Sequence, residues 1–125
     1  MATSLPLAGS RILIVEDRYL MATEMAEEVR RLGAEVVGPS PDLAHATEIV
    51  GREAIDVALL DVNLDGELVF PLADILAEKG VPFIFLTGYE RDTLPMSWRD
   101  RPSLAKPINP RELREQLVKA APARG

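Results

Sequence analysis

The sequence predicts an α/β domain in which five parallel strands form one sheet with helices on both of its faces. Short apolar runs alternate along the chain with longer segments in which apolar residues recur every three or four positions, the spacing of one helix face. The apolar runs are continuous rather than alternating, which is typical of strands buried on both faces. A chain of 125 residues is the right size for one such domain, and no linker marks a second.

Five segments are predicted as strands because each is a short run rich in aliphatic or aromatic residues. They are Arg11–Val15 and residues 35–37, 57–60, 83–86 and 103–105. The domain is therefore expected to cover residues 11–121, with a flexible tail over residues 1–10 and a frayed end over residues 122–125.

Four segments are predicted as helices, namely residues 20–32, 41–50, 68–79 and 110–121. A glycine follows each of the first three, Gly33, Gly51 and Gly80, where a helix end favours a left-handed residue. Ser40 and Asn109 are the expected N-caps of the second and last helices, because each is a capping residue followed by proline. The connection between the fourth and fifth strands is not expected to form a long helix, since prolines interrupt it.

The charge balance argues against nucleic-acid and membrane partners. Fourteen Lys and Arg stand against twenty Asp and Glu, a net charge of −6, and an acidic surface repels phosphate backbones. No apolar run reaches the roughly 18 residues that a membrane span needs. The chain contains no cysteine, which excludes disulfides and thiolate chemistry and fits a cytoplasmic protein.

Polar residues follow the predicted strands at the same end of each strand. Glu16 and Asp17 follow the first strand, Asp61 follows the third, Thr87 ends the fourth and Lys106 follows the fifth. The carboxyl ends of parallel strands share one edge of the sheet, where open α/β sheets place their ligands. Three carboxylates, a hydroxyl and an ammonium are therefore expected to meet there.

This set of groups indicates phosphoryl chemistry. Clustered carboxylates raise one another's pKa unless a cation joins them, and Mg²⁺ fits a site of a few carboxylates, waters and a phosphate oxygen. A carboxylate beside such a metal can attack phosphorus, which would give an aspartyl phosphate. The lysine ammonium and the threonine hydroxyl would stabilise charge on the phosphoryl oxygens. We therefore predict a phosphoryl-accepting site that uses Mg²⁺.

Four motifs carry a resemblance to a known family. They are Ile14-Val15-Glu16-Asp17, Leu59-Leu60-Asp61-Val62-Asn63-Leu64-x-Gly66, Phe85-Leu86-Thr87-Gly88-Tyr89 and Ala105-Lys106-Pro107. With these motifs in this order, the chain from about Arg11 to Ala120 resembles the receiver domains of response regulators, and the Phe-x-Thr-Gly-Tyr pattern resembles a subtype found among stand-alone regulators. The resemblance implies a three-layer, doubly wound, flavodoxin/CheY-like fold with strand order 2-1-3-4-5.

The resemblance also implies roles for the acidic residues. Asp61 matches the phosphoacceptor. Asp17 would bind Mg²⁺ directly, Glu16 would act mostly through water, and the backbone carbonyl of Asn63 would complete the metal site. Glu16 stands where the family more often has Asp, which adds one methylene and is expected only to shift the water shell of the metal.

Further roles follow for the ends of the last two strands. By resemblance, Thr87 and Lys106 would bind the phosphoryl group, and the bond from Lys106 to Pro107 is expected to be cis, which proline makes accessible. The family's usual switch aromatic stands three residues before this lysine, where this chain has Ser103. Tyr89 is the candidate replacement.

The predicted function is that of a single-domain response regulator in a two-component system or phosphorelay. A histidine kinase or histidine phosphotransfer protein would phosphorylate Asp61, and the signal would leave by binding an unidentified protein or by phosphotransfer. The chain would then be a signalling domain rather than an enzyme. Two alternatives stay open: a receiver-like binding module that works without phosphorylation, and an aspartyl-phosphate phosphohydrolase, although such enzymes place their nucleophile after the first strand.

Three further residues stand out in the sequence. Trp98 and Met96, in the irregular segment after the fourth strand, could form an exposed anchor for a partner or a lid packed on the last strands. His45, the only histidine, is expected to be a surface residue of the second helix.

Overall fold

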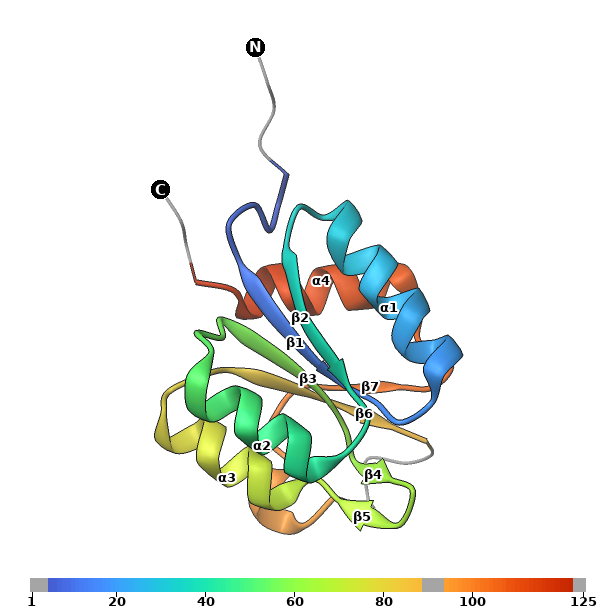
Figure 1. Cartoon of the computed structure of the whole chain (residues 1–125). Coiled ribbons are helices and arrows are strands. Elements are labelled where there is room, and N and C mark those ends of the chain that lie inside the picture. Colours follow the sequence, from blue (N-terminus) through green and yellow to red (C-terminus); the bar gives the residue numbers. More distant parts are fainter. Residues whose placement is uncertain (1–4, 89–93, 123–125) are drawn as a thin grey trace.

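Five parallel strands form the centre of the computed structural model, which describes residues 5–88 and 94–122 (Figure 1). The strands are β1 (Arg11–Val15), β2 (Glu35–Ser40), β3 (Val57–Asp61), β6 (Phe83–Thr87) and β7 (Ser103–Ala105). Their order in the sheet is β2-β1-β3-β6-β7, with every neighbouring pair parallel. The predicted order 2-1-3-4-5 is therefore confirmed, because the short strands β4 and β5 lie in a separate hairpin.

Four α-helices in the described part of the chain cover the sheet. They are α1 (Tyr19–Arg31), α2 (Leu43–Arg52), α3 (Phe70–Glu78) and α4 (Pro110–Ala120). Helices α1 and α4 pack on one face, and α2 and α3 on the other (Figure 1). Strands β3 and β6 are buried along their whole length, as their continuous apolar runs predict. None of the helices in residues 5–88 and 94–122 is long and apolar enough to cross a membrane.

The ends of α2 differ from the prediction. Ser40 is not the N-cap: it is the last residue of β2 and is buried, because strand pairing continues from Val15 to Ser40. Asp42 caps the helix instead, and its side chain accepts a hydrogen bond from the backbone N–H of His45 at 2.8 Å. Gly51 does not end the helix, which continues to Arg52.

The predicted N-cap of α4 and the glycines predicted after α1 and α3 are confirmed. Asn109 caps α4, and its side-chain oxygen accepts hydrogen bonds from two backbone N–H groups of the first turn. Gly33 and Gly80 have φ angles of 96° and 72°, the left-handed conformation that glycine adopts without strain. The peptide bond between Lys106 and Pro107 is cis, as the resemblance implies, and a second cis bond precedes Pro39.

The segment before β1 packs against the domain, in contrast to the flexible tail expected for residues 1–10. Leu7 is only 1% exposed and joins the core beneath α1 and α4. Its backbone N–H donates to the carbonyl of Leu32 at 2.8 Å. Leu5 lies over Gly33, where an added Cβ would come within 2.7 Å of the Leu5 Cβ. Burial of Leu7 and the contact of Leu5 with Gly33, after the end of α1, therefore hold the described part of this segment in place.

The connection that follows Asp61 forms a small hairpin that periodicity did not predict. Strand β4 (Asn63–Leu64) pairs antiparallel with β5 (Glu67–Leu68). The turn between them uses positive φ angles at Asp65 and Gly66. Because the hairpin includes residue 68, helix α3 begins at Phe70 rather than at 68.

The connection between β6 and β7 contains a 3-10 turn, Met96–Trp98. The Trp98 ring packs edge-on against Phe83 and Phe85, with centroid distances of 5.7 and 6.0 Å. Trp98 is half-buried and packs on the strand as the lid interpretation expects, and the interpretation as an anchor for a partner stays untested. Met96 is 79% exposed beside it. His45 is exposed, as expected, and its Nδ1 atom lies 2.9 Å from the Ser40 hydroxyl.

Candidate functional site

The candidate site lies where the order of the strands reverses. The chain leaves β1 toward β2 on one side, and β3 lies on the other side of β1. Open α/β sheets bind ligands at the carboxyl ends of their strands at such a point. Glu16 and Asp17 directly follow β1, and Asp61 is the last residue of β3.

Glu16, Asp17 and Asp61 form an acidic cluster at this edge. One carboxylate oxygen from each lies within 4.8 Å of the others. Glu16 is 2% exposed and Asp61 is 4% exposed, whereas Asp17 is half-buried. The predicted convergence of three carboxylates from two strands is therefore confirmed.

Lys106 lies between the two buried carboxylates. Its Nζ atom is 3.2 Å from Glu16 Oε2 and 3.1 Å from Asp61 Oδ2. The backbone N–H of Lys106 donates to the carbonyl of Thr87 at 2.8 Å, which continues the pairing of β6 with β7. The backbone of Lys106 is therefore held by the sheet, and its ammonium forms ion pairs with both Glu16 and Asp61.

The two oxygens of Glu16 have different environments. Oε1 accepts a hydrogen bond from the backbone N–H of Arg18 at 3.0 Å. Oε2 is buried within ion-pair distance of Lys106, yet in the described residues no donor meets it with hydrogen-bond geometry. The backbone N–H of Glu16 donates to the carbonyl of Ser40 at 3.0 Å, which ties the start of this loop to β2.

Burial dominates the electrostatics of both enclosed carboxyl groups. It raises the pKa of Glu16 to about 7, and the nearby Asp61 charge adds to that rise, while the Arg18 N–H and Lys106 oppose it. Burial also raises the pKa of Asp61, against the stabilising effect of Lys106. One ammonium therefore does not fully compensate the negative charge that the fold encloses here.

Thr87 and Asn63 complete the predicted set. Thr87 is buried at the end of β6, one position beyond Leu86, the partner of Asp61 in the sheet. Within the described part of the chain, its hydroxyl makes one long contact, 3.5 Å, to the carbonyl of Leu104. The backbone N–H of Asn63 points to Asp61 Oδ1 at 3.4 Å, and the Asn63 side chain accepts from Gly66 N–H.

The donor set fits a hard divalent cation such as Mg²⁺. Carboxylate oxygens are the protein ligands that Mg²⁺ prefers, and three of them meet here. A buried carboxylate oxygen without a hydrogen bond is a group that a cation would satisfy. Burial raises the pKa values of Glu16 and Asp61, and a bound cation would oppose that rise by favouring their ionised forms.

Sequence reasoning placed the side chains but missed two backbone groups that hold Glu16. They are the N–H of Arg18 and the carbonyl of Ser40. Neither contact depends on the type of side chain, so no pattern in the sequence signals it. Tyr89, the predicted switch residue, lies outside the described residues.

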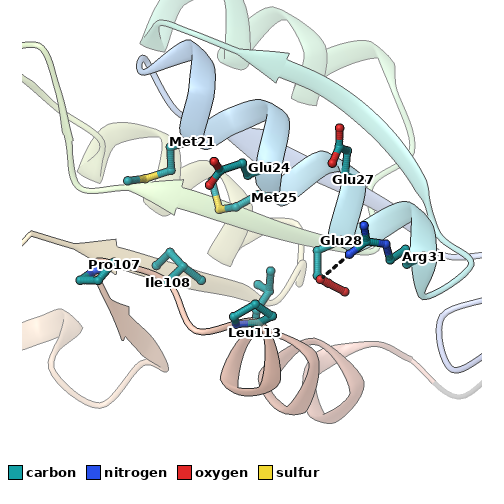
Figure 2. Close-up of a pocket in the computed structure, with 10 residues that line it drawn as sticks. Met21, Glu24, Met25, Glu27, Glu28, Arg31, Pro107, Ile108 and Leu113 are labelled. Carbon is teal, nitrogen blue, oxygen red and sulfur yellow. Dashed lines mark hydrogen bonds and ion pairs between the residues drawn. The ribbon is translucent and has the colours of Figure 1, made fainter.

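A groove of about 280 Å³ adjoins the loop after Lys106 (Figure 2). Its apolar lining comes from α1, from the loop before α4 and from α4 itself, including Met21, Met25, Ile108 and Leu113. Acidic residues of α1 also line it, and one of them, Glu28, pairs with Arg31 at 3.3 Å. Among the described residues that line it, none belongs to the acidic cluster.

A doubly wound α/β domain of five parallel strands, with an acidic cluster and a lysine at its switch point, is of the CheY-like class. Within that class, the chain belongs to the response regulator receiver domain family, whose model matches residues 12–118. Receiver domains are signalling domains of two-component systems and typically bind Mg²⁺ at such a cluster.

Individual relatives agree with this assignment. SdrG from Sphingomonas melonis Fr1 is 38% identical, with a TM-score of 0.79 over 87% of this chain and 93% of that one. The response regulator PhyR from Brucella abortus is 28% identical, with a TM-score of 0.80 over 94% of this chain and 50% of that one. The transcriptional regulatory protein PdtaR from Mycobacterium tuberculosis is 30% identical over 80% of this chain. The chain spans 49% of the length of PdtaR.

Proposed function

We propose that Asp61 accepts a phosphoryl group from a histidine kinase or a histidine phosphotransfer protein. The observation that supports this most directly is the position of Asp61, which is buried, paired with Lys106 and grouped with two further carboxylates. In this proposal, Glu16, Asp17, Asp61 and the backbone carbonyl of Asn63 hold Mg²⁺. The chain then acts as a signalling domain of a two-component system.

The proposed transfer is a displacement at phosphorus. A carboxylate oxygen of Asp61 forms a bond to phosphorus while the bond to the donor's histidine nitrogen breaks, and its electron pair stays on that nitrogen. The ammonium of Lys106 and the hydroxyl of Thr87 donate hydrogen bonds to the phosphoryl oxygens. Bound Mg²⁺ supplies positive charge that offsets the carboxylates and the phosphoryl oxygens.

The surroundings of the site support a protein as donor and as recipient of the signal. A donor histidine has to approach Asp61 from the carboxyl edge of the sheet, and the groove between α1 and α4 opens beside that edge at Pro107. Its lining combines apolar side chains with the carboxylates of Glu24, Glu27 and Glu28. We infer that a donor with apolar and basic side chains docks there.

Phosphorylation by a small donor tests the proposal. Incubation with acetyl phosphate and Mg²⁺ should add one phosphoryl group to the wild type, seen by intact mass, and none to Asp61→Asn. Removal of Mg²⁺ with EDTA should abolish labelling, because Lys106 alone does not compensate the charge of the site.

Asp65→Asn is the matched control. Asp65 is an exposed carboxylate in the hairpin that follows Asp61, and asparagine tolerates its positive φ of 53°. This variant should be labelled like the wild type. Labelling that persists in Asp61→Asn would place the acceptor elsewhere. An unlabelled wild type would favour a receiver that binds its partner without phosphorylation.

A further inference from the structure

The face of β6 that carries Thr87 also carries an aromatic cluster. Alternate residues of a strand share one face, so Phe83, Phe85 and Thr87 lie on the side covered by α2 and α3. Phe83 and Phe85 pack edge to face at 5.3 Å, and Phe70 of α3 meets Phe85 at 5.8 Å. The cluster therefore reaches along the strand to within two residues of the proposed phosphoryl-binding hydroxyl.

Trp98 adds a ring to this cluster from outside the sheet. The neighbour of Phe85 on β7 is Ser103, whose small side chain supplies no ring. The ring comes instead from the 3-10 turn, where Trp98 meets both Phe83 and Phe85. The single tryptophan of the chain thus joins the connection between β6 and β7 to the strand that ends in Thr87.

The turn around Trp98 is held together as one unit. Leu94 is buried in the same core cluster, and its carbonyl accepts a hydrogen bond from Arg99 Nε at 3.0 Å. The guanidinium of Arg101 lies 4.8 Å from the centre of the Phe83 ring and 5.6 Å from that of Trp98. A displacement of the Trp98 ring would therefore move the turn, including the exposed Met96.

We propose that Trp98 couples the state of Asp61 to the position of the turn over residues 94–101. This inference rests on the proposed function. Among the described residues, the Thr87 hydroxyl contacts only a carbonyl, at 3.5 Å, so these residues hold it weakly against a new acceptor such as a phosphoryl oxygen. Packed rings rearrange between discrete arrangements rather than deform gradually, so a shift at the end of β6 makes Trp98 repack. Trp98 is thus a positioning residue that acts through Phe85 and Thr87.

The fluorescence of Trp98 reports the coupling directly, because the chain contains no other tryptophan. Addition of Mg²⁺ and beryllofluoride, a stable mimic of a phosphoryl group, should change the emission of the wild type in a saturable manner. Asp61→Asn should show no change. Thr87→Val lacks a phosphoryl-binding hydroxyl and should bind beryllofluoride more weakly. At concentrations where ¹⁹F NMR shows its site to be filled, it should still lack the change in emission.

The affinity for beryllofluoride is a second measurement of the coupling. A purely structural role of Trp98 in the core would not change this affinity. If Trp98 has different contacts in the two states, its removal must alter the affinity for beryllofluoride, by about fivefold or more for a typical coupling. We expect this change in Trp98→Ala and its reversal in Trp98→Phe, which keeps a ring. Phe70→Leu is the matched control, because it removes a different ring that packs on Phe85. It should leave the affinity for beryllofluoride within about twofold of wild type, which is less than the change of about fivefold or more expected for coupling.

The outcomes separate this inference from the proposed function. Bound beryllofluoride without any change in Trp98 emission overturns the coupling and leaves phosphorylation of Asp61 standing. A shift in affinity that is equal in Phe70→Leu and Trp98→Ala also overturns it, because the effect would then be general loosening of the core. Failure of beryllofluoride to bind the wild type overturns both.

Discussion

Replacing Glu16 by glutamine removes a buried negative charge while keeping the shape of the side chain. Burial raises the pKa of Glu16 from 4.5 to about 7, so the folded protein binds this proton more tightly than the unfolded chain does. The stability that this proton contributes is complete below pH 4.5 and is lost as the pH rises to about 7. Without metal, the wild type should therefore become less stable across this range.

The magnitude follows from the size of the rise. At about 1.4 kcal/mol per pH unit, a pKa raised from 4.5 to about 7 corresponds to roughly 3 kcal/mol in the free energy of unfolding. Glu16→Gln should recover up to that amount at pH 8 and almost nothing at pH 4.5. For a domain of this size, the difference corresponds to about 10 °C in melting temperature.

Urea unfolding of both proteins in EDTA, at a series of pH values, measures this difference. Subtracting the two plots of unfolding free energy against pH removes the contribution of groups that titrate alike in both proteins. Each plot by itself should still depend on pH, because burial raises the pKa of Asp61 in both proteins. Adding Mg²⁺ at pH 8 should stabilise the wild type more than the variant, because the cation binds the ionised carboxylate. Glu67→Gln, at an exposed carboxylate of the hairpin, should change stability by less than about 0.5 kcal/mol. A Glu16→Gln protein that is no more stable than the wild type at pH 8 without metal would refute this reasoning.

Three further outcomes test other parts of the structure. Asp17→Asn should weaken Mg²⁺ binding at least about tenfold in calorimetry, and more than Glu16→Gln does; equal losses would mean that Glu16 reaches the ion directly. Gly33→Ala should lower the free energy of unfolding in urea by more than about 1 kcal/mol, because φ is 96° there and the new Cβ would meet Leu5. Gly51→Ala, inside α2, should raise it by up to about 1 kcal/mol, because the new Cβ would meet nothing. Leu7→Ala should lose about 2–5 kcal/mol, and an unchanged unfolding midpoint would contradict the packed N-terminal segment.

The strands of the sheet could be predicted because each is signalled by the residues of its own segment. A strand buried on both faces needs an uninterrupted apolar run, and such runs occur where β3 and β6 form. The start of α2 could not be predicted in the same way. Ser40 followed by proline is a strong local capping signal, but the backbone pairing between β1 and β2 extends to Ser40, so the tertiary contact decides.

The same distinction applies at the candidate site. The topology brings the carboxyl ends of the strands together, so the side chains at those ends could be placed from sequence alone. The position of Lys106 between two carboxylates and the unsatisfied oxygen of Glu16 depend on how long side chains pack in three dimensions. Local patterns carry no information about such packing. Local patterns also do not show that Trp98 packs on Phe83 and Phe85, because these partners lie on β6, in a different element of the chain.

One backbone hydrogen bond, from Lys106 N–H to the carbonyl of Thr87, fixes the spacing of the two residues that would grip the phosphoryl group. The chain that joins them plays no part in that spacing, and lengthening a surface loop costs little free energy. A change in the length of this connection is therefore expected to leave the spacing of the two residues unchanged. The groups that would bind the phosphoryl oxygens and the surface that the connection presents to a partner can therefore change independently of each other.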